Sequence, residues 1–410
     1  MDYEVHAFDN GIRLIYKQVQ ATNIAHCGMI IDAGSRDEDP GEEGLAHFIE
    51  HMLFKGTNKR KSFHVLSRLE VVGGELNAYT TKERTAIFTT IVDEFTERAV
   101  ELMADVAFNS NFPLKEMEKE KKVVIEEIAM YKDTPEENIM DEFQELIYPN
   151  HPLGVNILGS KKSVKAFKQK DLFNFQKKNY STDRMVFAFV GKLPLKKVVR
   201  ICAKYFEKIE PNIVPQRRRA YEGSTQFNLV KKKSHVQGHC VMGAPAYSLH
   251  DDNKIALMLL TNLLGGPGMN SRLNLAIREK YGFAYQIDAG YSAYSDTGLF
   301  NIYVGTDKNN INRSVELIHK ELKKLREQKL GRVQLHQART QFSGQISMAE
   351  ESRTSLMLTL GQSLLEYGKV DSLEEILRKV NAVDEHKLME VANEILSEEK
   401  LSYLIYQPRR

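Results

Sequence analysis

The feature that most constrains the fold of this chain is an internal repeat at about half of its length. The segment 98–102, Arg-Ala-Val-Glu-Leu, recurs as Arg-Ser-Val-Glu-Leu at 313–317, an offset of 215 residues. Each copy follows an apolar, strand-like run, at 85–92 and at 298–304 respectively. Matches that keep the same order at one offset indicate two domains with a shared fold.

The segment between the copies has the composition of a linker. It contains two prolines, Pro211 and Pro215, and no helical period. We therefore predict a first domain over 1–210, a linker over 211–222 and a second domain over 223–410. In each half, strands are followed by an amphipathic helix, a hairpin-like pair of strands, further helices and a final strand. This grouping predicts an α+β fold, with helices packed on one face of a mostly antiparallel sheet.

The charge balance gives no reason to expect nucleic acid or an anionic membrane as a partner. The 410 residues include 57 basic and 55 acidic side chains, for a formal net charge of +2. Two basic runs, 217–219 and 231–233, interrupt this balance. We interpret them as part of the linker and as a solvated strand edge.

The cysteines and the N-terminus favour a cytoplasmic location. Cys27, Cys202 and Cys240 form an odd, sparse set, which argues against a disulfide framework and favours a reducing compartment. The N-terminus lacks a basic segment followed by an apolar run, so no signal peptide is predicted. No stretch of about 18 apolar residues predicts a membrane span. Export after removal of a leader is the alternative.

A metal-binding pattern lies in the first half. The segment 44–54 has no helix breaker after its first residue, and an acidic turn at 39–43 precedes it, as is typical of helix starts. On this helix His47 and His51 share a face, because they are four residues apart. Glu50 lies beside that face. Two imidazoles and a carboxylate suit zinc and leave a fourth position for water.

A histidine pair at this spacing can also be purely structural. Here the order H-x-x-E-H, with Glu50 before the second histidine, is itself a peptidase signature. A second pair, His235 and His239, has no accompanying carboxylate and lies in a strand-like pattern. Residues four apart on a strand are separated by more than about 12 Å. We therefore interpret the second pair as structural.

The third ligand should be a carboxylate from elsewhere in the chain. The predicted helix 118–131 carries Glu120 and Glu127, which share a face because they are seven residues apart. Glu126 points elsewhere. Most glutamates on such a helix are solvated, so the spacing alone leaves the choice of ligand open.

These motifs together resemble a known family. H-x-x-E-H, followed 76 positions after its second histidine by a glutamate in a Val-Ile-Glu-Glu context, resembles the inverted-motif zinc peptidases. This is the family of pitrilysin, insulin-degrading enzyme and the mitochondrial processing peptidase, and the chain is similar in size to its short bacterial members. The resemblance covers nearly the whole chain. It implies one zinc ion per chain held by His47, His51 and Glu127, with Glu50 as general base and Glu120 as the carboxylate that supports the base.

Two further segments resemble the family's substrate-binding parts. The segment 73–80 looks like the edge strand to which a substrate peptide adds as a further strand. The resemblance implies main-chain hydrogen bonds along this strand, including Ala78, and a side-chain bond from Asn77. An ordinary hairpin strand is the alternative. In the second half, Arg278 and Tyr285 resemble a pair that donates hydrogen bonds to the substrate carbonyl and the developing oxyanion.

The two halves have divided their functions. At the positions that correspond to the metal motif, the second half has Leu259, Asn262 and Leu263. The resemblance therefore implies that the first half holds zinc and the second contributes substrate contacts. Because both sets occur in one chain, we expect a self-sufficient homodimer, with a heterodimer as the alternative. The loop 265–271 is short beside the glycine-rich loop of the processing peptidase's non-catalytic subunit, so leader-peptide specificity is not expected.

The predicted function is that of a zinc metalloendopeptidase acting on peptides or flexible polypeptide segments. A zinc-activated water would attack the scissile carbonyl, and Glu50 would accept its proton and pass it to the leaving amine. The alternative is a non-catalytic peptide-binding or structural subunit of a processing-peptidase-like heterodimer. The intact metal motif argues against that alternative.

Overall fold

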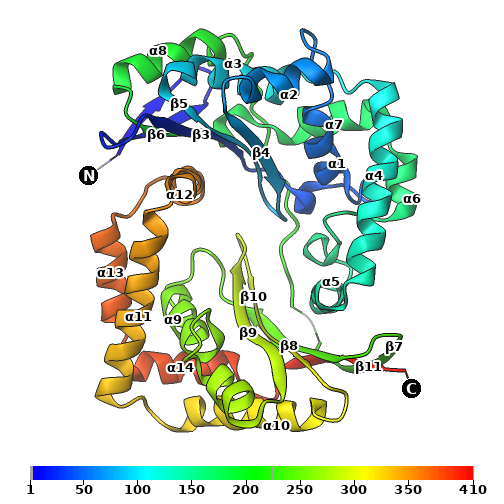
Figure 1. Ribbon diagram of the computed structural model, residues 1–410, viewed down its shortest axis with the longest axis vertical. Coiled ribbons are helices and arrows are strands. Elements are labelled where there is room, and N and C mark those ends of the chain that lie inside the picture. Colours follow the sequence, from blue (N-terminus) through cyan, green and yellow to red (C-terminus); the bar gives the residue numbers. More distant parts are fainter. Residues whose placement is uncertain (1–2, 224, 410) are drawn as a thin grey trace. The chain divides into compact units, whose positions relative to one another are not determined.

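The computed structural model describes residues 3–223 and 225–409, which form two compact units (Figure 1). Neither unit is a continuous stretch of the chain. Unit 1 contains the residues up to Ala129, together with Val155–Arg218 and Met348–Ser372. Unit 2 contains Met130–Gly154, Arg219–Ser347 and the residues from Leu373 onward.

Unit 1 is built on a six-stranded sheet with the strand order β1-β2-β6-β3-β5-β4. Neighbouring strands are antiparallel, except that β2 and β6 are parallel. The strands are β1 (Glu4–Ala7), β2 (Arg13–Gln18), β3 (Ile24–Ile31), β4 (Glu75–Thr80), β5 (Thr85–Val92) and β6 (Met185–Gly191).

Over its described residues, unit 2 repeats this sheet without a counterpart of β1. Its strand order is β7-β11-β8-β10-β9, and again one pair, β7 and β11, is parallel. The predicted repeat and the mostly antiparallel α+β fold are thereby confirmed, and β4 and β9 are the corresponding edge strands. The strands are β7 (Asn228–Lys233), β8 (Gly238–Ala246), β9 (Ala284–Ala293), β10 (Gly298–Thr306) and β11 (Ser402–Pro408).

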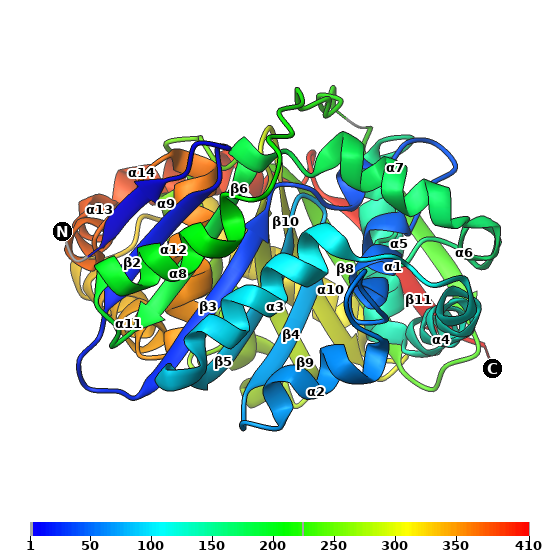
Figure 2. The same cartoon turned by 90° about the horizontal axis from the view of Figure 1, so that it is seen from above.

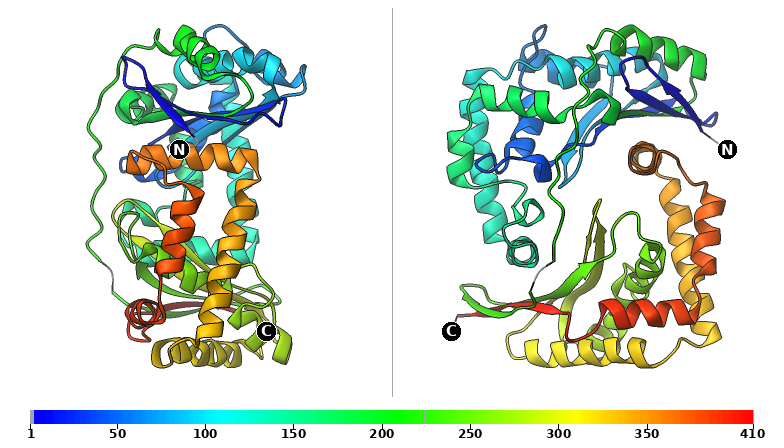
Figure 3. Two further views of the ribbon diagram at one scale, coloured as in Figure 1. Left: turned by 90° about the vertical axis from the view of Figure 1, so that its left-hand side faces the viewer. Right: turned by 180° about the vertical axis from the view of Figure 1, so that it is seen from behind.

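Helices cover both faces of each sheet, whereas the sequence predicted helices on one face only. In unit 1, α3 and α8 cross one face (Figure 2), and α12 lies on the other. In unit 2, α9, α10 and α14 cover one face and α5 the other, and α10 and α14 lie side by side (Figure 3). The helices are α1 (Leu45–Leu53), α2 (Ser62–Glu70), α3 (Thr96–Asn109), α4 (Leu114–Asp133), α5 (Pro135–Ile147), α6 (Lys161–Ala166), α7 (Gln169–Asn179), α8 (Leu195–Phe206), α9 (Lys254–Gly265), α10 (Ile311–Glu327), α11 (Arg332–Glu350), α12 (Arg353–Tyr367), α13 (Leu373–Ala382) and α14 (Glu385–Ile395).

The two halves of the chain exchange one helix each. Helix α12, from the second half, packs Met357 and Leu360 into the same core cluster as Ile30 of β3 in unit 1. Helix α5, from the first half, packs Phe143 into the core cluster of the unit 2 sheet that contains Val241. Because of this exchange, the compact units differ from the continuous domains predicted over 1–210 and 223–410.

The helix on the second face explains why some strands are apolar on both sides. β6 (Met185–Gly191) is buried at every position, and so is β10 (Gly298–Thr306). A strand with one solvated face alternates apolar and polar residues, whereas a strand covered on both faces is a continuous apolar run. The sequence Met-Val-Phe-Ala-Phe-Val-Gly of β6 is such a run.

One basic residue of the predicted linker has a largely buried side chain. The side chain of Arg218 is 9% exposed and lies 2.8 Å from Asp32 and 2.9 Å from Asp37. Two carboxylates compensate the desolvation of the guanidinium, which anchors this end of the linker on unit 1. Cys27, Cys202 and Cys240 are buried and free. Among the described residues, no helix is long and apolar enough to cross a membrane.

Candidate metal centre

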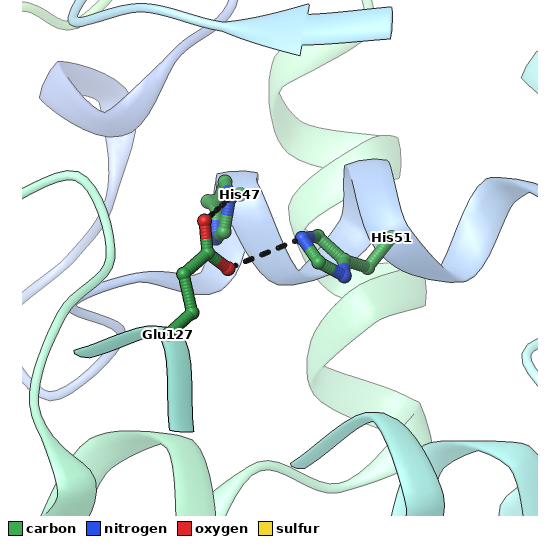
Figure 4. A group of neighbouring side chains, drawn as sticks. All are labelled: His47, His51 and Glu127. Atoms are coloured by element: carbon green, nitrogen blue, oxygen red, sulfur yellow. Dashed lines mark ion pairs between the residues drawn. The ribbon is translucent and has the colours of Figure 1, made fainter. Parts of the chain in front are cut away.

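Three side chains of unit 1 converge at one point, from helices far apart in the sequence (Figure 4). His47 and His51 lie on successive turns of α1, and Glu127 comes from α4. The Glu127 carboxylate lies 3.8 Å from His47 Nε2 through Oε1 and 3.6 Å from His51 Nε2 through Oε2. One ligand atom from each residue fits within 4.8 Å of the others.

This group has the donor set and spacing of a zinc site. Zinc binds histidine nitrogen and carboxylate oxygen at about 2.0–2.2 Å in tetrahedral geometry, which places two ligand atoms about 3.4 Å apart. The separations of 3.8 and 3.6 Å are close to that value. Burial, followed by the charge of neighbouring His51, lowers the pKa of His47 to about 3. His47 is therefore neutral at physiological pH, which is the form that binds a metal.

Glu120 fixes the orientation of one imidazole. Its Oε2 lies 3.1 Å from His51 Nδ1, and its Oε1 lies 2.6 Å from Lys55 Nζ. A charged carboxylate accepts a hydrogen bond from Nδ1–H, which leaves the lone pair of Nε2 for a metal, as outer-shell carboxylates do at metal-binding histidines. Burial raises the pKa of Glu120, but the hydrogen bonds from His51 and Lys55 outweigh it, and the net pKa is lowered.

Glu50 lies beside the triad without belonging to it. Its Oε2 accepts a hydrogen bond of 2.6 Å from the Thr80 hydroxyl at the end of β4. Burial raises the pKa of Glu50, and the Thr80 hydrogen bond and nearby His51 act in the opposite direction. A bound cation would favour the ionised carboxylate. The structure thus places a carboxylate that can accept a proton next to a possible metal site.

The start of α1 is held from two sides. Glu38 accepts hydrogen bonds from the main-chain N–H groups of Gly44 at 3.0 Å and Ala46 at 2.8 Å, which satisfies donors that the first turn leaves unpaired. Gly44 itself has φ of 92°, and a Cβ there would lie 2.5 Å from the carbonyl oxygen of Leu158. These contacts fix the helix that carries His47.

Replacing Gly44 by alanine should therefore destabilise unit 1 more than the same change at Gly41. Gly41 has nearly the same φ, +95°, but open space where a Cβ would be. Both variants incur the strain of positive φ, whereas only Gly44→Ala adds a clash with main-chain atoms, which costs about 1–3 kcal/mol more. Chemical denaturation of the two variants measures the difference. Equal losses of unfolding free energy would contradict the packing assigned to Gly44.

The unpaired edge of β4 is adjacent to Glu50. The N–H of Thr81 donates to the Arg84 carbonyl oxygen at 2.7 Å, so this N–H points toward the side of β5. Because successive residues of an antiparallel pair face alternate sides, the main-chain groups of Thr80, Ala78 and Leu76 face the unpaired edge. The resemblance had pointed to Ala78 in this strand, and the register gives it free main-chain groups.

Comparison with known proteins assigns the chain to a family. The sequence model described as "Insulinase (Peptidase family M16)" matches residues 13–161, and the one described as "Peptidase M16 inactive domain" matches residues 166–342. "Uncharacterized zinc protease YmxG" of Bacillus subtilis is 32% identical over 396 residues, covering 97% of this chain and 96% of that protein. This chain belongs to peptidase family M16.

Other M16 proteins are also similar to this chain over nearly its whole length. An "Uncharacterized zinc protease" of Rickettsia bellii is 29% identical over 408 residues, covering 98% of this chain and 97% of that protein. The crystal structure of a peptidase M16 inactive domain from Pseudomonas fluorescens has a TM-score of 0.92 at 19% identity, covering 100% of this chain and 99% of that one. A protease from Helicobacter pylori has a TM-score of 0.91 at 21% identity, covering 99% of each chain. These two structures support the fold.

The other predicted site residues of this M16 chain lie as follows. Asn77 is exposed on β4, and its neighbour Tyr79 accepts a hydrogen bond of 2.7 Å from Gln362 of α12. Arg278 lies in a π-helical turn, η5 (Asn274–Glu279), and Tyr285 on β9 is 84% exposed. Both belong to unit 2, so their contact with substrate at the metal centre stays a prediction.

The second half of the M16 chain has no metal-binding group among its described residues. Leu259, Asn262 and Leu263 lie on α9, where Asn262 donates to Gln345. The prediction that His235 and His239 lie on one strand was wrong, because β7 ends at Lys233 and β8 begins at Gly238. The rings of His235 and His239 are therefore only 6.4 Å apart, but no carboxylate joins them in a metal-binding group.

Sequence reasoning did not find the roles of three residues around α1, the helix that carries His47 and His51. Lys55, Thr80 and Glu38 contact Glu120, Glu50 and the start of α1 respectively. Lysine, threonine and glutamate occur on every protein surface, and the pairs they form are separated by long stretches of sequence. Only Lys55 had a local signal in the sequence: it follows His51 by four residues, which is the spacing of about one helical turn.

Proposed function

We propose that this chain is a zinc metalloendopeptidase that holds one zinc ion on His47, His51 and Glu127. The observation that carries the proposal is the convergence of these three side chains, with the Glu50 carboxylate beside them. Membership of the M16 family and the names of its relatives as zinc proteases support it. The name "inactive domain" applies to residues 166–342, which do not include the metal-binding group.

The residues around the triad suit hydrolysis of a peptide bond. A zinc ion held by His47, His51 and Glu127 would polarise the substrate carbonyl and lower the pKa of a water molecule at the site to about 7. Glu50 would accept a proton from the water as its oxygen bonds to the carbonyl carbon, and would donate that proton to the amine as the C–N bond breaks. Glu120, which is itself paired with Lys55, holds His51 in the tautomer that leaves Nε2 free.

The substrate would bind as an added strand on the unpaired edge of β4. Main-chain groups of Leu76, Ala78 and Thr80 face that edge and can pair with a peptide of almost any sequence. Asn77 would add a side-chain hydrogen bond. In the second half, Arg278 and Tyr285 would donate to the substrate carbonyl and the oxyanion. This mode of binding selects extended, flexible segments rather than folded domains.

If the substrate binds as an added strand, N-methylation of its amides should raise KM at every second position. In a peptide substrate methylated at one amide at a time, every second position near the scissile bond should raise KM about tenfold, because a hydrogen bond is lost there. Positions between them should change KM little. KM measured across such a series tests the binding mode. A uniform effect at all positions would contradict it.

We further propose that the chain acts without a different partner chain and forms a homodimer. The metal triad, Glu50 and the Arg278–Tyr285 pair all occur in this one sequence. Cleavage of peptides by the chain purified alone, with its mass measured by sedimentation, tests both statements. Activity that appears only after a second, different chain is added would favour the alternative of a subunit in a heterodimer.

A further inference from the structure

We propose that Thr80 is a positioning residue that orients the general base Glu50 and links it to the strand that receives the substrate. This inference rests on the proposed function. It assigns no chemical step to Thr80, whose hydroxyl acts through the carboxylate that it contacts.

The first observation is the hydrogen bond itself. Thr80 Oγ1 lies 2.6 Å from Glu50 Oε2, and within the described part of the chain it is the donor that holds this carboxylate. A glutamate side chain has several rotatable bonds, and ordering it has an entropic cost. A bond to one oxygen fixes the carboxylate plane and leaves Oε1 available to accept a proton.

The second observation is that Thr80 is itself rigid. It is paired with Thr85 of β5, and the adjacent turn is closed by the bond from Thr81 N–H to the Arg84 carbonyl oxygen. Threonine is β-branched, so its χ1 angle is restricted. The hydroxyl is therefore presented from a fixed main chain, as an effective outer-shell contact requires.

The third observation concerns the free edge of β4. The main-chain groups of Thr80 face the unpaired edge, while its side chain faces Glu50 on α1. A peptide added to β4 therefore pairs with the same residue whose hydroxyl holds the base. Thr80 would therefore contact both the substrate main chain and Glu50. Its position would set the distance from the scissile bond to the base, and catalysis depends on such positioning.

The test is a pair of substitutions at Thr80. Thr80→Val keeps the shape of the side chain and removes the hydroxyl, so we expect kcat to fall about 10- to 100-fold, because a misplacement near 1 Å costs about that much. KM should change less than about threefold, because the main-chain hydrogen bonds to substrate remain. Thr80→Ser keeps the hydroxyl and should restore kcat to within a few-fold of the original protein. Zinc content should be one per chain in both variants.

Thr89→Val is the matched control. Thr89 lies on neighbouring β5, and its buried hydroxyl donates to the Glu75 carbonyl oxygen, away from Glu50. The same atoms are removed, so a general effect on the sheet would appear here as well. We expect kcat of this variant to be unchanged.

Three kinetic results would overturn the inference: an unchanged kcat in Thr80→Val, an equal loss in Thr80→Ser, or an equal loss in Thr89→Val. Loss of zinc from Thr80→Val would also overturn it, since the role would then be structural. Failure of the proposed function is a separate result, in which the original protein itself cleaves no peptide in the presence of zinc.

Discussion

Glu50→Gln should lower kcat for peptide hydrolysis by about 10²- to 10⁴-fold, the usual contribution of a general base. The amide has nearly the shape of the carboxylate and can still accept the hydrogen bond from Thr80 at one atom. It cannot take a proton from water at neutral pH. The triad of His47, His51 and Glu127 does not include this side chain, so the variant should bind zinc normally.

Zinc content and kinetics, measured on one preparation of Glu50→Gln, distinguish a role of Glu50 as general base from a role as zinc ligand. Metal analysis should give one zinc per chain in Glu50→Gln, and KM should stay close to that of the original protein, because no substrate-binding group has been altered. Hydrolysis at the original rate would remove Glu50 from the role of base. Loss of zinc from this variant would instead make it a ligand.

Glu127→Ala should abolish zinc binding at working concentrations and, with it, peptide cleavage. Loss of an outer-shell partner typically costs 10- to 100-fold in metal affinity, and loss of a direct ligand should cost more. The matched control is Glu126→Ala. Glu126 is the neighbouring residue on α4, but it is exposed and lies outside the metal-binding group.

Zinc affinity measured by competition with a coloured chelator distinguishes the two variants. Glu126→Ala should match the original protein in affinity and activity. If Glu127→Ala kept its zinc, or if both variants lost it equally, the third ligand would have to be sought elsewhere.

The sequence predicted the part of the site that depends on local geometry. His47 and His51 share a face because a helix places residues four apart on one side, and the structure has that helix at Leu45–Leu53. The spacing of Glu120 and Glu127 predicted that both lie on one face of α4, and in the structure that face is turned toward α1. Spacing alone could not say which of the two glutamates joins His47 and His51 in the metal-binding group, because that depends on how α1 and α4 pack. Only the family resemblance indicated Glu127.

Contacts between distant segments were beyond the reach of the sequence. The exchange of α5 and α12 between the halves is an example, since an amphipathic helix gives no sign of which sheet it will cover. Likewise, Thr80 was one residue of a predicted edge strand, and nothing local showed that its hydroxyl holds Glu50. The burial of the Arg218 side chain in the predicted linker was not foreseen either, because its two carboxylate partners are about 180 positions away.

The central claim, that this chain is a peptidase whose activity depends on one zinc ion, is tested most directly by titrating zinc into protein stripped by a chelator. The account predicts no cleavage of a peptide library in the stripped protein, and a rise in cleavage that ends at one zinc per chain. Glu127→Ala, titrated alongside, should show no such rise. Cleavage by the metal-free chain, or one tightly bound zinc without any cleavage, would contradict the account.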